Sequence, residues 1–374
     1  MSGCWRSWLS TEAATNLVCR TPEPATKAKT QMKAVMKLAP GPGHGGLGQV
    51  PEPVAGPGQV KIAVAAAGIC GTDLHIEADE YRNRPPVVLG HECAGVVAEV
   101  GSGVTTVAAG QRVTALPYAV QCGRCTYCRQ GQYPLCSDRA AFGSGVDGAF
   151  APYLVIPADI VRPLPEHVDL ECGALSEPLA CCVKAVQESA TIRAGDLVVV
   201  VGPGPIGLLA LQLVKLQGAT AVLLGTAQDA HRLALGRDLG ADLALQADAD
   251  DLWSALGELS RGEGADVVLE CAGVPAATRT ALRAVRKRGQ LVQMGLHGRP
   301  FELDFEQIVY KDLRVIGSFA SSATSWDRAL ALLANGSLQL RPLISAVLPL
   351  EEWEQAFAMV RRREGLKVLL RPGG

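Results

Sequence analysis

A run of five apolar residues, Leu197–Val201, leads directly into a glycine-rich turn at residues 202–207 and then into a helix-like segment at residues 208–216. The spacing G-x-G-x-x-G is a weak signal by itself, but between a strand and a helix it is a strong one. There the glycines let the backbone approach a pyrophosphate that rests on the helix N-terminus. A flexible glycine loop would not explain the periodic flanks. The feature therefore predicts a dinucleotide site whose candidate contacts are Gly202, Gly204, Pro205, Ile206 and Gly207.

Two different patterns divide the rest of the chain. From Met32 to about Leu164, short β-like runs are broken by Gly and Pro, which indicates an all-β unit, with a turn expected at residues 40–48. From about Asp196, apolar strands alternate with amphipathic helices, which is typical of a doubly wound parallel sheet. The predicted fold class is therefore α/β, with parallel strands at residues 197–201, 221–224, 243–245, 267–269, 291–294 and 313–316.

At 374 residues the chain is too long for one ordinary core, and we expect four segments. Residues 1–31 form a tail that is predicted to be disordered and lacks the continuous apolar core of a secretory signal; a transit peptide and a start at Met32 are alternatives. Residues 32–186 form the catalytic domain, and residues 187–319 form the dinucleotide-binding domain. Residues 320–374 have no obvious core of their own and are expected to return to the catalytic domain.

The composition favours a small-molecule substrate. The net charge is -2 and no long Lys/Arg block occurs, so the electrostatics give no reason to expect nucleic acid or an anionic membrane as a partner. Charged residues make up 19% of the chain, which does not suit a membrane protein. The 12 cysteines are clustered at metal spacing or scattered through apolar segments, so a reducing cytoplasm is a better expectation than a disulfide-bonded secreted protein.

Four cysteines follow the spacing C-x2-C-x2-C-x7-C, at Cys122, Cys125, Cys128 and Cys136. Four thiolates on a short turning loop can surround one zinc ion tetrahedrally and leave no open position, as in a structural site. An iron–sulfur cluster would also accept four cysteines, whereas four buried free thiols do not suit a polar loop. The spacing predicts a structural zinc site.

A second candidate metal site draws its residues from two segments, residues 68–75 and residues 90–92. Cys70 and His91 are soft and borderline ligands, as an open catalytic zinc site requires. Taken alone, Cys70 is more often a small buried residue and His91 more often a core histidine. Their joint occurrence ahead of the four-cysteine loop carries the inference.

These motifs, together with Glu177-Pro178-Leu179 and the glycine turn, resemble in type and order the zinc-containing branch of the medium-chain dehydrogenase/reductase superfamily, which includes sorbitol and threonine dehydrogenases. The resemblance covers nearly everything from Met32 onward. It implies a GroES-like β-barrel catalytic domain beside a Rossmann domain, one catalytic and one structural zinc ion per chain, and NAD or NADP as cofactor. It also implies a homotetramer or homodimer.

The resemblance further implies roles for single residues. Cys70 and His91 would bind the catalytic zinc directly, and Glu92 would be either a ligand or a neighbour of the ligands. Glu177 stands where alcohol dehydrogenases carry a third, cysteine ligand, and where polyol and threonine enzymes carry a carboxylate that binds zinc directly or through water. The adjacent cysteines at residues 181–182 are alternative ligands, although the helical stretch around them favours core packing.

In the mechanism that this resemblance implies, zinc polarises the substrate hydroxyl and lowers its pKa, and the alkoxide becomes a ketone as hydride leaves for the nicotinamide. Thr72 would take the proton and pass it through the cofactor ribose toward His75 at the surface. The alternatives are a helix N-cap for Thr72 and a solvated loop position for His75.

The residues after the second predicted parallel strand bear on the choice of cofactor. That strand should end in an acidic residue that holds the ribose hydroxyls of NAD, but it ends in Gly225-Thr226. Thr226 offers a neutral hydroxyl to a 2′-phosphate, and Arg232 lies near enough to add a charge, unless it is an ordinary solvated helix residue. Asp229 comes too late for the usual position. The sequence admits both NAD and NADP, with a slight preference for NADP.

We therefore predict an oxidoreductase that transfers a hydride between a secondary alcohol, namely a polyol, and NAD(P), with a threonine-type or general secondary-alcohol dehydrogenase as the alternative. A zinc-independent reductase of this fold would lack Cys70, His91 and the four-cysteine loop. A non-catalytic binding protein on this scaffold would tend to have lost Cys70, Thr72 or the glycine turn. Sorbitol dehydrogenases carry an Arg-Tyr pair where this chain has Ala320-Ser321, so we expect an uncharged, hydroxyl-rich pocket that does not suit phosphorylated sugars.

Overall fold

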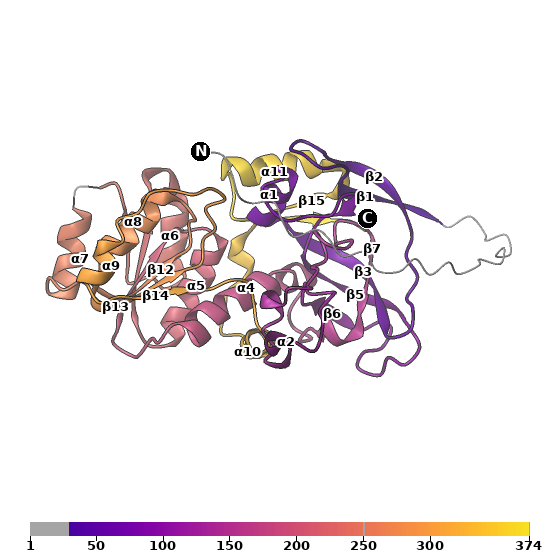
Figure 1. Ribbon diagram of the computed structural model, residues 1–374, viewed down its shortest axis with the longest axis horizontal. Coiled ribbons are helices and arrows are strands. Elements are labelled where there is room, and N and C mark those ends of the chain that lie inside the picture. Colours follow the sequence, from indigo (N-terminus) through magenta and orange to yellow (C-terminus); the bar gives the residue numbers. More distant parts are fainter. Residues whose placement is uncertain (1–29, 250, 374) are drawn as a thin grey trace, which may run out of the picture.

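The computed structural model describes residues 30–249 and 251–373, which form two bodies joined side by side (Figure 1). One body is mainly antiparallel β structure, and the other is built around a parallel sheet. They meet along α4 (Ser176–Val183), α5 (Pro205–Leu216) and α10 (Ala323–Ala334), and α4 packs against both of the other helices. The predicted fold class is confirmed.

The first body contains a seven-stranded sheet in the order β15-β16-β3-β5-β6-β8, with β7 paired to β3. Its strands are β3 (Gln59–Gly68), β5 (Glu92–Val100), β6 (Arg112–Ala115), β7 (Tyr153–Pro157), β8 (Val161–Pro163), β15 (Ile344–Pro349) and β16 (Lys367–Arg371). Alternate residues of β3, such as Ile62 and Val64, are buried, which is the period of a strand with one face on a core. β15 has no counterpart among the predicted strands.

A smaller sheet in the order β2-β1-β4 consists of β1 (Gln31–Lys37), β2 (Gly45–Pro51) and β4 (Val87–Val88). β2 takes up part of the stretch that was expected to be a turn. Its glycines allow close packing against β1, because a Cβ at Gly48 would lie 2.5 Å from Sδ of Met36. The predicted N-terminal tail lies outside the described residues, apart from Thr30 and Gln31.

The second body contains a parallel sheet in the order β11-β10-β9-β12-β13-β14. Its strands are β9 (Leu197–Val201), β10 (Thr220–Gly225), β11 (Leu243–Gln246), β12 (Ala265–Glu270), β13 (Val285–Gln293) and β14 (Arg314–Gly317). Its other helices are α6 (Ala230–Asp238), α7 (Leu252–Ser260), α8 (Pro275–Ala284) and α9 (Glu306–Tyr310). β13 begins at Val285 rather than at the predicted Leu291, because the charged residues 286–288 obscure its apolar pattern.

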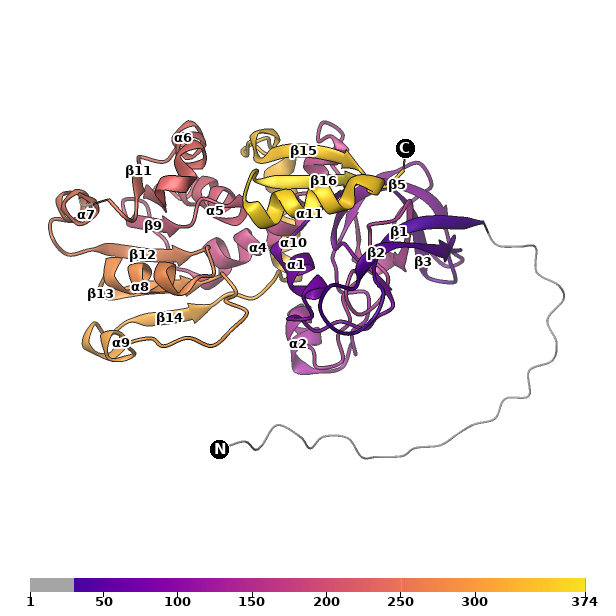
Figure 2. The ribbon, with the colours of Figure 1, turned by 90° about the horizontal axis from the view of Figure 1, so that it is seen from above.

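The C-terminal part of the chain crosses back to the first body. β16 pairs antiparallel with β3, with Leu369 opposite Gly68, and α11 (Trp353–Arg362) packs against β16. Figure 2 shows β15, β16 and α11, in yellow, beside β1 and β5. This pairing carries Lys367 to the start of β5. Within the described ranges, no helix combines the length and apolarity needed to cross a bilayer.

Candidate active site

The cysteines of the predicted structural site gather on one loop that carries the short helix α2 (Thr126–Arg129). The sulfur atoms of Cys122, Cys125, Cys128 and Cys136 all lie within 4.8 Å of one another, and those of Cys122 and Cys128 are 3.9 Å apart. Tetrahedral sulfur ligands at a Zn–S distance of about 2.3 Å would be about 3.8 Å apart, so the loop fits a closed zinc site. Backbone N–H groups of Cys125 and Arg124 lower the pKa of Cys122 to about 6, which favours the thiolate that zinc binds.

The second candidate metal site lies where β3 ends and β5 begins. Cys70 follows β3 and is the N-cap of α1 (Gly71–Glu77), while His91 and Glu92 open β5. The two segments meet because Gly68 of β3 lies opposite Glu92 in the antiparallel pair. One ligand atom each of Cys70, His91 and Glu92 lies within 4.8 Å of the other two. This mixed set of three donors suits an open zinc site that keeps a position for substrate.

Asp73, which the sequence analysis missed, orients this group. It is fully buried, its Oδ2 accepts a hydrogen bond from the backbone N–H of Cys70 at 2.9 Å, and its Oδ1 lies 3.3 Å from Nδ1 of His91. Because Nδ1 is engaged, Nε2 of His91 is left for a metal. Burial alone would lower the pKa of His91, but Asp73 and Cys70 raise it well above its ordinary value. The sequence signal that could have identified Asp73 is its place in residues 68–75, the same segment that supplies Cys70.

Glu92 is buried and forms an ion pair with Lys367. Both carboxylate oxygens accept from Nζ of Lys367, at 2.8 and 2.7 Å, and Nζ also donates to the carbonyl of Ile69 at 3.2 Å. The carboxylate needs a glycine in the paired strand, because a Cβ at Gly68 would clash with Oε2. Burial alone would lower the pKa of Lys367, but Glu92 raises it above its ordinary value, which keeps the lysine charged. The sequence analysis missed Lys367 because it is so distant along the chain.

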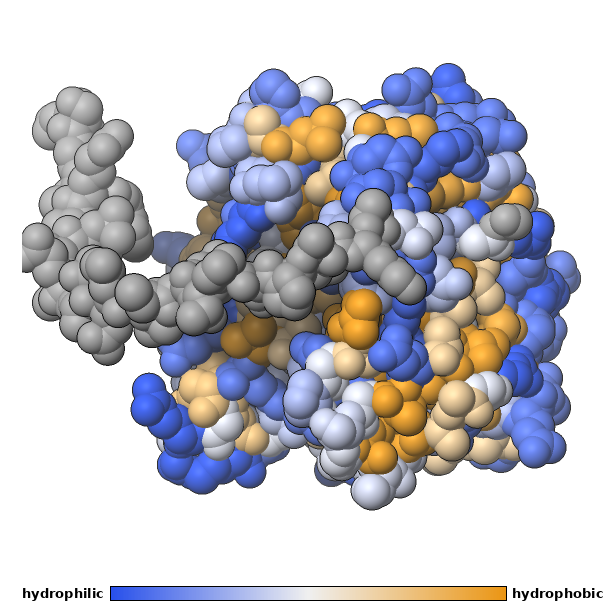
Figure 3. All heavy atoms as spheres, turned by 90° about the vertical axis from the view of Figure 1, so that its right-hand side faces the viewer, coloured by the Kyte–Doolittle hydropathy of each residue, from blue (hydrophilic) through white to orange (hydrophobic). Residues whose placement is uncertain are grey.

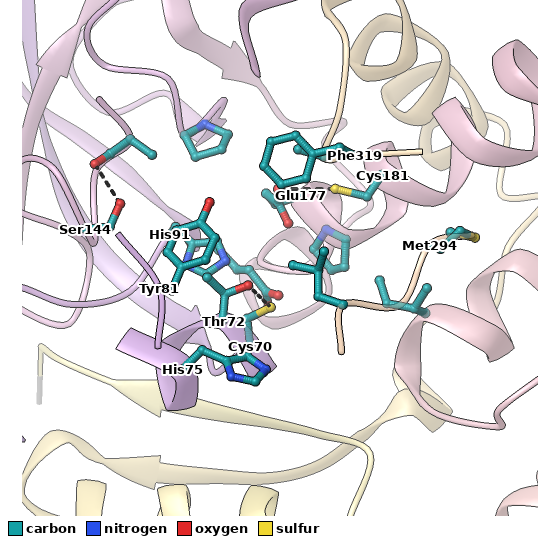
Figure 4. A pocket seen from close by; sticks show the side chains of 18 of the residues that line it. Cys70, Thr72, His75, Tyr81, His91, Ser144, Glu177, Cys181, Met294 and Phe319 are labelled. Carbon is teal, nitrogen blue, oxygen red and sulfur yellow. Dashed lines mark hydrogen bonds between the residues drawn. The ribbon is translucent and has the colours of Figure 1, made fainter. Parts of the chain in front are cut away.

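We call Cys70, His91 and Glu92 the metal group. Glu177 lies on α4 and lines the same cavity, although it is not one of these three mutually close donors. Its Oε1 accepts from Sγ of Cys181 at 3.4 Å, and Figure 4 shows the two side chains together on the wall that α4 forms. Burial raises the pKa of Glu177. Cys182 instead points into the core, where its Sγ contacts the carbonyl of Ile206 at 3.4 Å. The structure therefore brings Cys181, but not Cys182, to the site.

These side chains line a cavity of about 340 Å³ between the two bodies. Thr72 is not the N-cap of α1; it lies in the first turn, with Oγ1 3.7 Å from Sγ of Cys70. His75 lies in the last turn of α1 and lines the cavity, with Nδ1 2.9 Å from Oε2 of Glu80, so it is not a loop histidine. Arg139 lines the same cavity, so the expectation of an uncharged pocket is wrong.

A second cavity, of about 490 Å³, runs along the glycine turn. Gly207 does not line it but supports the turn, because a Cβ there would clash with the carbonyl of Gly202. Gly202 itself has a φ of 105°, which favours glycine. Cys70 and Glu92 line both cavities, so the metal group lies where the two meet. The predicted cofactor contacts that line this cleft are Gly202, Gly204, Pro205, Ile206, Thr226 and Arg232.

The end of this cleft near Thr226 differs from the sequence expectation. Asp229 reaches back to the end of β10, where its Oδ2 accepts from the backbone N–H and the hydroxyl of Thr226 at 3.0 and 2.8 Å. Arg232 is not a solvated helix residue, because it is 7% exposed and donates to the carbonyls of Arg363 and Gly365 at 2.8 and 2.6 Å. Arg363, which the sequence analysis missed, lines the cleft from the C-terminal segment. The carboxylates of Asp229 and Asp248 and the guanidinium groups of Arg232 and Arg363 therefore line the cleft at the position predicted to select the cofactor.

Comparisons with known proteins match both parts of the chain. Residues 56–166 match the alcohol dehydrogenase GroES-like domain, and residues 205–335 match the zinc-binding dehydrogenase family. The chain is 40% identical to a sorbitol dehydrogenase of Halalkalibacterium halodurans, over 91% of this chain and 99% of the relative. It is 39% identical to a D-arabitol-phosphate dehydrogenase of Enterococcus avium, over 91% of this chain and 97% of the relative.

A solved structure extends the similarity to three dimensions. A zinc-binding dehydrogenase of Sinorhizobium meliloti, crystallised with NADP, is 36% identical and superposes with a TM-score of 0.84, over 92% of this chain and 100% of that one. The matching domains, the relatives and the shared fold agree with one another. The chain belongs to the zinc-containing alcohol dehydrogenases of the medium-chain dehydrogenase/reductase superfamily, enzymes that transfer a hydride between an alcohol and NAD or NADP.

Proposed function

We propose that this enzyme oxidises a secondary hydroxyl group of a polyol to a ketone, with Cys70, His91 and Glu92 as the protein ligands of the catalytic zinc and Glu177 facing its open position. The observation that carries this proposal is that Cys70 and Glu92 line both cavities. A metal ion held there would face the substrate on one side and the nicotinamide on the other. The relatives named sorbitol and D-arabitol-phosphate dehydrogenase support a polyol substrate.

In this proposal, a zinc ion held by Cys70, His91 and Glu92 would act as a Lewis acid that lowers the pKa of the substrate hydroxyl, and a bound nicotinamide would accept the hydride. Asp73 keeps Nε2 of His91 aimed at the metal group through its contact with Nδ1. The hydroxyl of Thr72, beside Cys70, accepts the substrate proton. His75, whose Nδ1 lies 2.9 Å from Oε2 of Glu80, passes that proton to solvent.

A second candidate is a threonine-type or simple secondary-alcohol dehydrogenase. The observation that favours an amino-acid substrate is Arg139, whose guanidinium can pair with a carboxylate in the cavity. A panel of polyols, L-threonine and simple secondary alcohols, each assayed with NAD and NADP, separates these candidates. Turnover of L-threonine or simple alcohols without turnover of any polyol would overturn the polyol proposal.

We propose that NADP is preferred as the cofactor. No acidic residue ends β10, and Arg232 and Arg363 line the same end of the cleft. Thr226 and Arg232 both contact the carboxylate of Asp229, which reduces its repulsion of a 2′-phosphate. Thr226→Asp should therefore lower the ratio of kcat/KM with NADP to that with NAD by about tenfold, which corresponds to about 1.4 kcal/mol. The uncharged Thr226→Asn is the matched control.

A parent enzyme that strongly prefers NAD would contradict the NADP proposal. An unchanged cofactor preference in the Thr226→Asp variant would also contradict it, because some other residue would then distinguish the adenosine ribose of NADP from that of NAD. Arg363→Gln offers a second measurement, since a lost guanidinium should weaken NADP more than NAD.

We also propose that the enzyme is a homodimer or homotetramer. Beside β14, at the edge of its sheet, α9 and its neighbours expose four large apolar residues, with 46% to 76% of each accessible: Phe305, Val309, Tyr310 and Val315. Such a group is the kind of surface that a second copy covers. By contrast, the face of the molecule in Figure 3 has separate hydrophobic patches between hydrophilic side chains. Light scattering on the purified enzyme tests this, and a stable monomer would contradict it.

The remaining proposals concern domain boundaries and compartment. We propose that the catalytic domain comprises residues 32–186 and 320–374, with residues 187–319 as the dinucleotide-binding domain; the pairing of β16 with β3 supports the first assignment. We also propose a cytoplasmic enzyme, because the thiols of both metal groups need a reducing compartment to stay free for zinc. Fractionation of cells that produce the full chain tests the compartment.

A further inference from the structure

The substrate cavity adjoins a smaller cavity of about 30 Å³. The two share Tyr81, Arg139, Ala141 and Ser144, so the small cavity continues one wall of the large one. Figure 4 shows Ser144 on the side of the substrate cavity that is far from Met294. A substrate held at the metal group can therefore extend toward the small cavity.

This small cavity is basic. Arg82, Arg84 and Arg139 line it, and in the described part of the chain no carboxylate oxygen lies within 4.0 Å of their guanidinium groups. Arg139 lies over the ring of Phe319, 5.1 Å from its centroid, which holds it at the boundary between the two cavities. The backbone N–H of Arg84 donates to the carbonyl of Ser144 at 2.9 Å, so the loops that carry the arginines are tied together.

The substrate space thus has two ends of different chemistry. One end holds the metal group, where the charge of Glu92 is balanced by Lys367. The other holds cations that no neighbouring side chain balances. Arg139 is half-buried, whereas Arg82 and Arg84 are exposed at the rim of the small cavity. The half-buried guanidinium of Arg139 attracts an anion more strongly than an exposed one, because water and salt screen it less. Arginine binds phosphate oxygens in pairs, and several arginines suit a group with about two negative charges.

We propose that the substrate is a polyol with a terminal phosphate monoester, whose phosphate binds at Arg82, Arg84 and Arg139 while its reacting hydroxyl lies at the metal group. This inference rests on the proposed function, because it concerns the other end of the same substrate cavity. It reverses the sequence-based expectation that the pocket does not suit phosphorylated sugars. In the reaction the hydroxyl-bearing carbon loses a hydride to the cofactor and the oxygen loses a proton to solvent. The phosphate ester bond stays intact.

The test compares kcat/KM for a pentitol and for its terminal phosphate, on the zinc-loaded full chain at low and high salt. The ester should be favoured by about tenfold or more, and the advantage should shrink at high salt. Arg139→Gln should lower the ratio of the two kcat/KM values. Arg82→Gln, on an exposed loop position, should do so as well and guards against misfolding of the first variant. Arg193→Gln is the control, because Arg193 is exposed and lines neither cavity.

The possible outcomes separate this inference from the proposed function. If the parent oxidises the pentitol at least as well as its phosphate, the inference is overturned and the proposed function stands. A ratio that stays unchanged in both arginine variants also overturns the inference. Turnover of neither compound would contradict the proposed function and the inference together, and preference for L-threonine would assign Arg139 to a carboxylate instead.

Discussion

The two candidate metal groups of this enzyme are built in opposite ways. The four-cysteine loop takes all its donors from residues 122–136 and holds them with backbone N–H groups of the same loop. The second group joins Cys70, after β3, to the start of β5, and holds its donors with the buried side chains of Asp73 and Lys367. Local spacing is therefore enough to form the first group, whereas the second exists only after the sheet has formed.

The two groups also differ in the charge of their donors and in the access of a substrate to a bound metal. The loop offers four thiols, so a metal bound by all of them would have no free position and would contribute folding free energy but no chemistry. The second group offers one thiol, one imidazole and one carboxylate that a lysine already balances, at the junction of two cavities. Loss of a donor from the first group should therefore lower stability without removing any chemistry, and loss of a donor from the second should remove turnover.

The largest effect is expected from Cys70→Ser. This variant should abolish turnover yet retain about one zinc ion per chain in the four-cysteine loop, because the two groups share no donor. Elemental analysis beside a rate assay measures both quantities. Full activity, or loss of both zinc ions without unfolding, would show that the two groups are not independent.

The second largest effect is expected from Thr72→Val. If the hydroxyl accepts the substrate proton, its removal should reduce kcat by about 10²–10⁴-fold, while cofactor binding changes little. Thr72→Ser keeps the hydroxyl and is the matched control. Steady-state kinetics measures kcat, and a cofactor titration measures cofactor binding. An unchanged kcat in the valine variant would remove Thr72 from the mechanism.

Lys367→Met tests whether the second group also stabilises the fold. It leaves the buried carboxylate of Glu92 without its partner, which should lower the free energy of unfolding by about 3–5 kcal/mol. Adding Glu92→Gln should recover part of that loss, because no charge then remains unpaired. Urea unfolding of the zinc-loaded proteins measures both. If the free energy of unfolding falls by less than about 1 kcal/mol, metal or water replaces the lysine as the partner of Glu92. The second group would then contribute to turnover and not to stability.

The smallest effect is expected from Cys128→Ala. It should lower the melting temperature or disturb assembly. The effect should be smaller than that of Lys367→Met, because the thiols of Cys122 and Cys125 are partly exposed and water can reach them. Each kcal/mol lost should correspond to about 2–4 °C. Cys172→Ala is the control, since both cysteines are 8% exposed and only Cys128 belongs to the metal group. Equal melting temperatures and subunit assembly for parent and Cys128→Ala would show that the loop is not structural.

The same contrast explains what the sequence could predict. Leu197–Val201 coincides with β9, because an apolar run is a local signal. The helix after the glycine turn begins at Pro205, inside the predicted turn, because proline is accepted at the first position of a helix. The four cysteines lie together because their spacing is also a local signal. The glycine-rich strand β2 shows the limit, since its glycines were expected to mark a turn and instead pack against β1.

Residues that act across the sheet left no such signal. Lys367 and Glu92 are 275 residues apart, and no local pattern around either residue predicts their ion pair. Arg139 follows the four-cysteine loop, and only the packing of two loops turns it into the wall of a cavity. Such pairings depend on tertiary geometry, which periodicity does not contain.

The pairing of β16 with β3 also fixes an order of events while the ribosome makes the chain. Lys367 donates to the carbonyl of Ile69, which was synthesised 298 residues earlier. At about 5–20 residues per second, roughly 15–60 s separate the two. During that time the whole parallel sheet can form, while β3 keeps an open edge near Gly68 and Glu92 waits without its counter-ion. A nascent chain halted before β16 should therefore bind chaperones through this edge and gain its catalytic centre only when translation resumes.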